Sequence, residues 1–237
     1  MRILYVFPHP DDESFGPAPA IARQRREGHE VQLLTLTRGE ATKQRHVLGY
    51  SLEEMAATRL EEMREVAGIL DLSGMMVLEF PDGGLQDLDP RVLEQVVVRE
   101  INAFRPHVIV TYAAHGISGH PDHLVTHAVV KRVFCATRET APWLQRLAFF
   151  TLREHGRPGR PAHLKGSPAA AIDCIVRFED VDRDRAAQAL EAYRTYAEVV
   201  RAHDPLAEVA EGVYFEFFGE SFDPPVESLV DGLTADD

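Results

Sequence analysis

Short, continuous apolar runs recur along the first half of the chain and alternate with longer amphipathic stretches. The runs at residues 3–7, 31–36, 75–80 and 108–112 contain few polar side chains, which is the pattern of strands covered on both faces of a parallel sheet. Between them, apolar residues recur three and four positions apart, as in helices. This alternation predicts a Rossmann-like α/β fold, with a mostly parallel sheet, right-handed crossovers and helices on both faces.

The helices of this half have recognisable starts and stops. Ser51 is placed to cap the longest one, and Glu54, three residues further on, completes a capping box. Gly28 is placed to end the first helix. Four helices are predicted here: residues 14–27, 51–72, 90–104 and from the motif at 120–123 to about 136.

The second half is organised differently. It begins with a predicted strand, continues with a long loop rich in Gly, Pro, Arg and Lys, and then alternates again: strand 147–152, loop 153–168, strand 172–178, helix 182–202 and strand 213–218. A lid, an oligomer contact and a solvated insertion all fit the loop. Because no linker is found, residues 1–237 are predicted to form one domain, with core βα units at 1–136 and a variable C-terminal part at 137–237.

The composition excludes several classes of protein. The 237 residues are 45% hydrophobic, as in globular proteins, and carry a net charge of −13, which opposes binding to nucleic acid or to anionic membranes. No apolar run is long enough for a spanning helix, and the N-terminal pattern is not that of a signal peptide. With only two cysteines, a disulfide framework is not expected, and the chain is predicted to be cytoplasmic.

Ionisable residues gather directly after the first predicted strand, in the sequence Pro8-His9-Pro10-Asp11-Asp12-Glu13. The carboxyl ends of strands are where open α/β sheets bind ligands. The acidic residues would repel a pyrophosphate, so a dinucleotide site is excluded, whereas a divalent cation would relieve their mutual repulsion. An acidic turn that caps the next helix is the alternative, but it does not explain the histidine.

A second motif, Gly119-His120-Pro121-Asp122-His123, follows the strand at 108–112. If the two strands are neighbours, the motifs meet at one point and supply the three protein ligands and open position of a catalytic zinc site. If those ligands are two imidazoles and one carboxylate, the site accepts Fe(II) as well as Zn(II).

These two motifs resemble the signature of the PIG-L/LmbE-like N-acetylglucosaminyl deacetylases, zinc-dependent amidases with a Rossmann-like fold. The resemblance covers about residues 1–130 and extends to three further places: Leu36-Thr37-Arg38-Gly39-Glu40, Arg59 with Glu62, and Phe80-Pro81-Asp82-Gly83. Toward the C-terminus it fades, because the family often has a His-Arg-Ser-Gln-like stretch where this chain has Tyr193-Arg194-Thr195-Tyr196.

The resemblance implies a role for each matching residue. It places the metal ligands at His9, Asp12 and His123, the general base at Asp11, and the histidine that stabilises the transition state at His120. The residues alone leave open which of the two neighbouring aspartates binds the metal.

Four other residues are candidate site residues, and three of them have competing interpretations. Asp122 is placed either to orient a protonated His120 or to cap the following helix. Arg38, Arg59 and Asp82 lie near strand ends, where they would hold sugar hydroxyls. The alternatives are a surface pair of Arg59 with the glutamate three residues on, and a turn role for Asp82.

We therefore expect a zinc-dependent hydrolase that removes an N-acetyl group from a glucosamine-type sugar conjugate. Another metal-dependent amidase or esterase, acting on a non-sugar acyl amine, is the alternative among enzymes. A non-catalytic sugar- or metal-binding protein is the alternative in another class, but Asp11 argues against it, because a binding site gains nothing from an extra carboxylate. The expected partner is a small N-acylated sugar, and the oligomeric state is left open.

Overall fold

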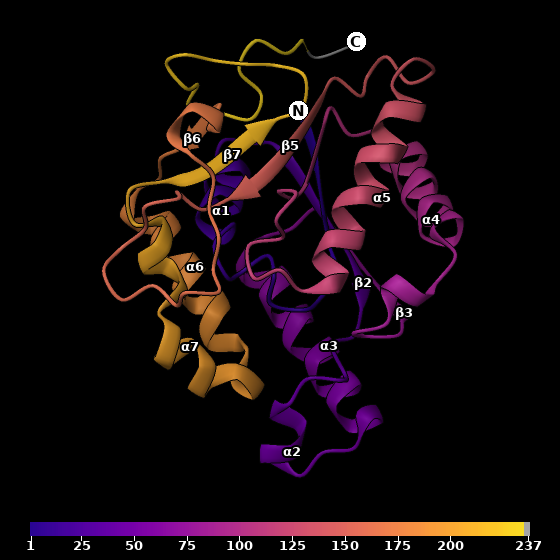
Figure 1. The fold of residues 1–237 in the computed structure, drawn as a ribbon, viewed down its shortest axis with the longest axis vertical. Helices are drawn as coiled ribbons and strands as arrows, with labels where there is room; N and C mark the ends of the chain where they lie inside the picture. Colours follow the sequence, from indigo (N-terminus) through magenta and orange to yellow (C-terminus); the bar gives the residue numbers. More distant parts are fainter. Residues whose placement is uncertain (235–237) are drawn as a thin grey trace.

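The computed structural model describes residues 1–234, which form one mixed sheet with helices on both faces (Figure 1). The strand order is β3-β2-β1-β4-β5-β7-β6. The strands are β1 (Arg2–Phe7), β2 (Glu30–Thr37), β3 (Gly74–Phe80), β4 (Val108–Tyr112), β5 (Arg146–Thr151), β6 (Cys174–Val176) and β7 (Val213–Phe217). Strands β3, β2, β1, β4 and β5 are parallel to one another. Strand β7 is antiparallel to both β5 and β6. The predicted α/β fold is confirmed.

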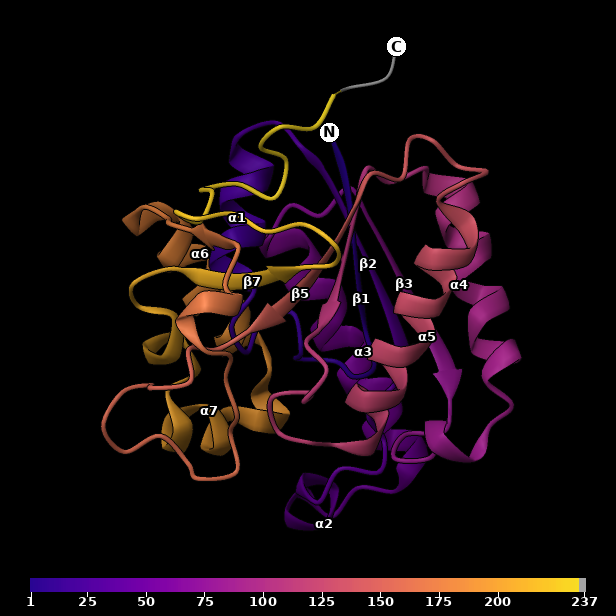
Figure 2. The same ribbon diagram turned by 45° about the horizontal axis from the view of Figure 1, so that its top comes forward.

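Two apolar cores lie on opposite faces of the sheet. Along β1, Ile3, Tyr5 and Phe7 belong to one core, and Leu4 and Val6 belong to the other, as the alternation of side chains along a strand requires. The helices are α1 (Ala18–Arg26), α2 (Gln44–Leu48), α3 (Leu52–Ile69), α4 (Pro90–Phe104), α5 (Pro121–Thr137), α6 (Asp180–Ala192) and α7 (Ala197–His203). Figure 2 shows α4 and α5 on one side of the sheet and α1 and α6 on the other. Within residues 1–234, no helix combines the length and apolar character needed to cross a bilayer.

Most predicted elements agree with the structure to within a few residues. The capping box at the start of α3 is present: the Ser51 hydroxyl accepts a hydrogen bond from the Glu54 N–H, and the Glu54 carboxylate accepts one from the Ser51 N–H. The short helix α2 was not predicted, because its five residues are too few to show a helical period.

The predicted helix over 182–202 is wrong in one respect, because the chain breaks it after Ala192. A 3₁₀ turn, η3 (Arg194–Tyr196), separates α6 from α7. At the break, the Thr195 N–H and hydroxyl both donate to the buried Glu62 carboxylate, at 2.9 and 2.6 Å. These long-range hydrogen bonds replace helical ones and turn the segment toward the carboxyl ends of the strands.

The first helix begins at Ala18 rather than at residue 14, because the chain approaches β5 closely at Gly16. The φ angle of Gly16 is +154°, and a Cβ at this position would lie 2.4 Å from Cζ of Phe150. Only glycine combines this backbone conformation with such close packing. The residues before the helix therefore form turns rather than a helical first turn.

We expect Gly16→Ala to lower the free energy of unfolding by about 1–3 kcal/mol, because the added methyl group overpacks the core against Phe150. Thermal or urea denaturation measures this change. Gly68→Ala is the matched control, since a Cβ at Gly68 meets no atom within 4 Å and alanine favours a helix. Equal stability of the two variants would show that the chain relaxes around Gly16 without cost.

Candidate metal centre and active site

A cavity of about 510 Å³ opens at the carboxyl ends of the parallel strands. Both histidine-containing motifs line it, because β1 and β4 are neighbours in the sheet and each motif follows one of these strands. The structure thus brings together the residues that were predicted to act on the metal and on water: His9, Asp11, Asp12, His120 and His123.

The three predicted ligands lie in mutual contact. Nδ1 of His9 lies 3.3 Å from Nε2 of His123 and 3.5 Å from Oδ2 of Asp12. Nε2 of His123 lies 3.4 Å from Oδ1 of Asp12. Two imidazole nitrogens and a carboxylate therefore converge on one point, which is the donor set that Zn²⁺ and Fe²⁺ accept.

Neighbouring groups hold two of these ligands in place. Nδ1 of His123 contacts the Gly116 carbonyl oxygen at 2.9 Å, which directs Nε2 of the ring toward the cluster. The Tyr112 hydroxyl donates to Oδ1 of Asp12 at 2.6 Å, and the Tyr112 ring stacks on the His123 imidazole at 4.1 Å. Sequence reasoning missed Tyr112, although its place at the end of β4 was a usable signal.

The other ring nitrogen of His9 faces two further carboxylates. Nε2 of His9 lies 3.2 Å from Oδ1 of Asp82 and 3.2 Å from Oδ2 of Asp122. Burial by itself would lower the pKa of His9, but the hydrogen bonds with Asp12, Asp122 and Asp82 raise that pKa well above its usual value. The cluster therefore favours positive charge at its centre, as a divalent cation would supply.

Asp122 orients a different histidine from the one expected. Its carboxylate contacts His9 and accepts hydrogen bonds from the N–H groups of Gly83 and Leu85, at 2.8 and 3.1 Å. The residue that caps α5 is His120, whose Nδ1 accepts a hydrogen bond from the Asp122 N–H at 3.2 Å. The side chain of Asp122 thus neither caps the helix nor hydrogen-bonds to the His120 ring. It points instead toward the segment that follows β3.

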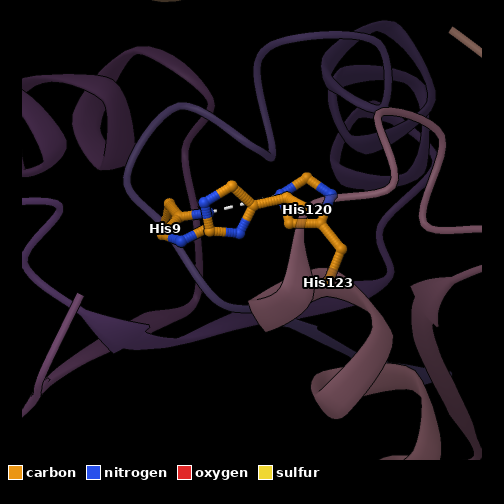
Figure 3. Close-up of side chains that lie close together, drawn as sticks. All are labelled: His9, His120 and His123. Atoms are coloured by element: carbon orange, nitrogen blue, oxygen red, sulfur yellow. Dashed lines mark hydrogen bonds between the residues drawn. The ribbon is translucent and has the colours of Figure 1, made fainter. Parts of the chain in front are cut away.

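His120 is held as a neutral imidazole beside the other two histidines (Figure 3). Burial lowers the pKa of His120, and Nδ1 is already an acceptor, so the ring proton is on Nε2. The protonated state expected from the sequence does not fit this arrangement. The donor nitrogens of His9, His120 and His123 also lie within 4.8 Å of one another, which makes His120 a competing ligand.

Asp11 is paired with the buried guanidinium of Arg59. Nη2 of Arg59 donates to Oδ2 of Asp11 and to the Pro10 carbonyl oxygen, both at 2.6 Å, and Nη1 donates to the Gly39 carbonyl oxygen at 3.1 Å. Burial raises the pKa of Asp11 to about 7, although the Arg59 charge opposes the rise. Only 2% of Arg59 is exposed, so the alternative interpretation, a surface pair with Glu62, is wrong.

Two tyrosines at the break between α6 and α7 complete the surroundings of the site. The Tyr193 hydroxyl donates to the buried carboxylate of Glu13 at 2.7 Å, and the Tyr196 ring lies under the Arg59 guanidinium at 4.4 Å. These residues occupy the stretch where the sequence departs from the family pattern. The departure from the family pattern was therefore the sequence signal that could have pointed to Tyr193 and Tyr196.

The three predicted sugar-binding residues are placed differently from one another. Asp82 and Arg59 line the cavity, and Asp82 also accepts a hydrogen bond from the Ala41 N–H at 2.7 Å. The guanidinium of Arg38 pairs instead with the exposed carboxylate of Glu79. The structure therefore brings Asp82 and Arg59 to the cavity but not Arg38.

Comparison with known proteins gives a consistent result. The model of the PIG-L family, described as GlcNAc-PI de-N-acetylase, matches residues 4–134. The chain is 30% identical to 1D-myo-inositol 2-acetamido-2-deoxy-alpha-D-glucopyranoside deacetylase of Thermobispora bispora, over 93% of this chain and 86% of that protein. This chain is 32% identical to mycothiol S-conjugate amidase of Streptomyces coelicolor over 161 residues. The match covers 59% of this chain but only about half (54%) of the amidase.

Solved structures show the same fold. A deacetylase of the teicoplanin biosynthesis pathway has a TM-score of 0.69 and 18% identity, with 92% of this chain and 96% of that chain covered. At this identity the likeness is one of fold alone.

Proposed function

The chain belongs to the PIG-L family, and on this premise we propose that it is a metal-dependent hydrolase that removes an N-acetyl group from a glucosamine-type sugar conjugate. One observation carries the proposal: two imidazoles and a carboxylate converge within 3.3–3.5 Å, beside a separate carboxylate that an arginine holds. A purely binding site has no use for that additional carboxylate.

We propose His9, Asp12 and His123 as the ligands of a zinc ion, with Fe²⁺ as the alternative. Two of the three donor groups are already in the form that binds a metal, whereas His9, whose pKa is raised, would release its proton as the metal binds. Burial lowers the pKa of His123 to about 4, and the nearby histidines lower that of Asp12 to about 2 despite its burial. A divalent ion at this place supplies Lewis acidity, which polarises the amide carbonyl group and makes water more acidic.

Asp11 is the proposed general base. Its carboxylate takes a proton from the water that attacks the amide carbon, and it can return this proton to the departing nitrogen, so that water and amide give a carboxylic acid and an amine. The raised pKa of Asp11, about 7, suits both transfers near neutral pH. Arg59 keeps the carboxylate oriented toward the cavity.

His120 is the proposed donor to the developing oxyanion. With Nδ1 held by the Asp122 N–H, its protonated Nε2 is available as a fixed hydrogen-bond donor. Asp82, near Thr42 and Lys43 on the β2–β3 side of the cavity, is the proposed contact for sugar hydroxyls.

Amine release from N-acetylglucosamine derivatives tests this proposal, with the metal content measured on the same sample. We expect turnover that a chelator abolishes and that added Zn²⁺ or Fe²⁺ restores. Turnover only of N-acyl amines without a sugar would favour the other amidase class. Sugar binding without turnover would favour a non-catalytic binding protein.

The assignment of ligands makes a separate prediction. His123→Ala should lower the metal content from about one ion per chain to a small fraction, because it removes one of three protein ligands. His120→Ala should retain the ion, since we propose His120 as a hydrogen-bond donor and not as a ligand. Metal analysis of the two purified variants distinguishes them, and loss of the ion from both would make His120 a ligand.

We also propose a cytoplasmic location, which the free thiols of Cys135 and Cys174 support because extracellular proteins more often carry disulfides.

A further inference from the structure

The cavity has two chemically different sides. Toward β2 and β3 it is lined by polar groups that include Thr42, Lys43 and Asp82. Toward β5 it is lined by apolar side chains, which we call the apolar compartment: Phe15, Ile117, Phe150, Leu152, Leu164 and Val199. The ligand cluster lies between the two sides, because it follows β1 and β4, the strands between β2 and β5.

The polar groups near the apolar compartment offer little to a sugar. Glu208 lines the cavity, but Nε of Arg157 and Nε of Arg160 bind its two carboxylate oxygens at 2.9 and 2.6 Å. His163 and His203 are exposed residues of the cavity lining. Sugar hydroxyls placed against the six apolar side chains would lose water without gaining hydrogen bonds, which costs free energy.

The geometry of the scissile bond determines what enters the compartment. A secondary amide is trans, so its nitrogen substituent and its acyl chain extend in opposite directions from the reacting carbon. With the sugar on the side of Asp82 and the reacting carbon near Asp11, the acyl chain extends toward Phe150 and Leu152 at the end of β5.

We propose that the apolar compartment binds the acyl chain of the substrate, and that the enzyme therefore also accepts acyl chains longer than acetyl, in the range of butanoyl to octanoyl. The proposal rests on the function proposed above and extends its substrate class from N-acetyl to longer N-acyl groups. Part of the loop at 153–168 lines the cavity, and Arg157 and Arg160 of this loop bind Glu208 in the 3₁₀ turn η4 (Pro205–Val209). Figure 2 shows this loop lying alongside α7.

The test compares kcat/KM for methyl glycosides of glucosamine that carry acetyl, butanoyl, hexanoyl and octanoyl groups. We expect kcat/KM to rise about two- to fourfold for each methylene group buried, until the compartment is full. A matched series of N-acetylglucosamine glycosides with methyl to octyl aglycones should show no such rise. A flat acyl series would overturn the proposal, and so would a rise only in the aglycone series, which would assign the compartment to the aglycone.

Val199→Asp and Leu164→Asp place a charge in the compartment from two different elements, so that one remains informative if the other does not fold. Each should lower the hexanoyl-to-acetyl ratio of kcat/KM at least tenfold. The control is Val92→Asp on α4, which changes a valine that is 44% exposed and should leave the ratio unchanged. An unchanged ratio in the two compartment variants would overturn the proposal.

Binding of the carboxylate products separates this inference from the proposed function. Calorimetry on the metal-loaded protein should give at least tenfold tighter binding of hexanoate than of acetate, with the difference lost in Val199→Asp. If no glucosamide is cleaved but hexanoate binds more tightly than acetate, the acyl-chain proposal is supported and the proposed sugar substrate is wrong. If glucosamides are cleaved but both acids bind equally, only the acyl-chain proposal is wrong.

Discussion

Asp11→Asn is expected to lower kcat by about 10²- to 10⁴-fold, because it removes the proton acceptor for the attacking water. The variant should keep its metal, since the Asp11 carboxylate pairs with Arg59 and not with the three proposed ligands. Single-turnover kinetics and metal analysis on one sample measure both effects.

The neighbouring Asp12→Asn is the matched control for this prediction. Asp12 contacts both histidines that are proposed as ligands, so exchanging its charged oxygen for a neutral amide should weaken metal binding, and activity should fall with occupancy. If Asp11→Asn is metal-free and Asp12→Asn remains loaded, the two roles are reversed. If both variants stay fully active, the hydrolytic mechanism is wrong.

Arg59→Met is expected to lower the free energy of unfolding by about 3–5 kcal/mol, because it leaves the buried Asp11 carboxylate without its partner. It should also lower kcat, since the carboxylate is no longer held toward the cavity. Chemical denaturation and steady-state kinetics measure the two losses.

The double variant Asp11→Asn with Arg59→Met isolates the pair. Because it removes both charges, it should be more stable than Arg59→Met alone, and the difference is the coupling free energy of the two side chains. A rise in KM alone, with stability and kcat unchanged, would instead support the direct sugar contact expected from the sequence for Arg59.

The convergence of the two motifs could be predicted from the sequence. Each motif follows an apolar run, and the carboxyl ends of neighbouring parallel strands meet at one edge of a sheet. His9 and His123, 114 residues apart, accordingly lie in contact. The prediction assumed that the two strands are neighbours, and the pairing of β1 with β4 meets this condition.

The partners of the surrounding side chains could not be predicted, because they are set by tertiary packing. Arg59 and Glu62 lie three residues apart on a helix, a spacing typical of a surface pair. In the structure both are buried and bind elsewhere, Arg59 to Asp11 and Glu62 to Thr195, which is 133 residues away. The break after Ala192 escaped prediction for the same reason.

The hydrogen bond between Glu13 and Tyr193 joins residues 180 positions apart, and it bears on how the protein forms during synthesis. The ribosome releases both histidine motifs well before residues 193–196, so for most of translation the nascent chain carries Glu13 and Glu62 without these partners. Contacts of such long separation also form slowly. A polypeptide interrupted before residue 193 would contain both histidine motifs and still lack the hydrogen-bond partners of Glu13 and Glu62.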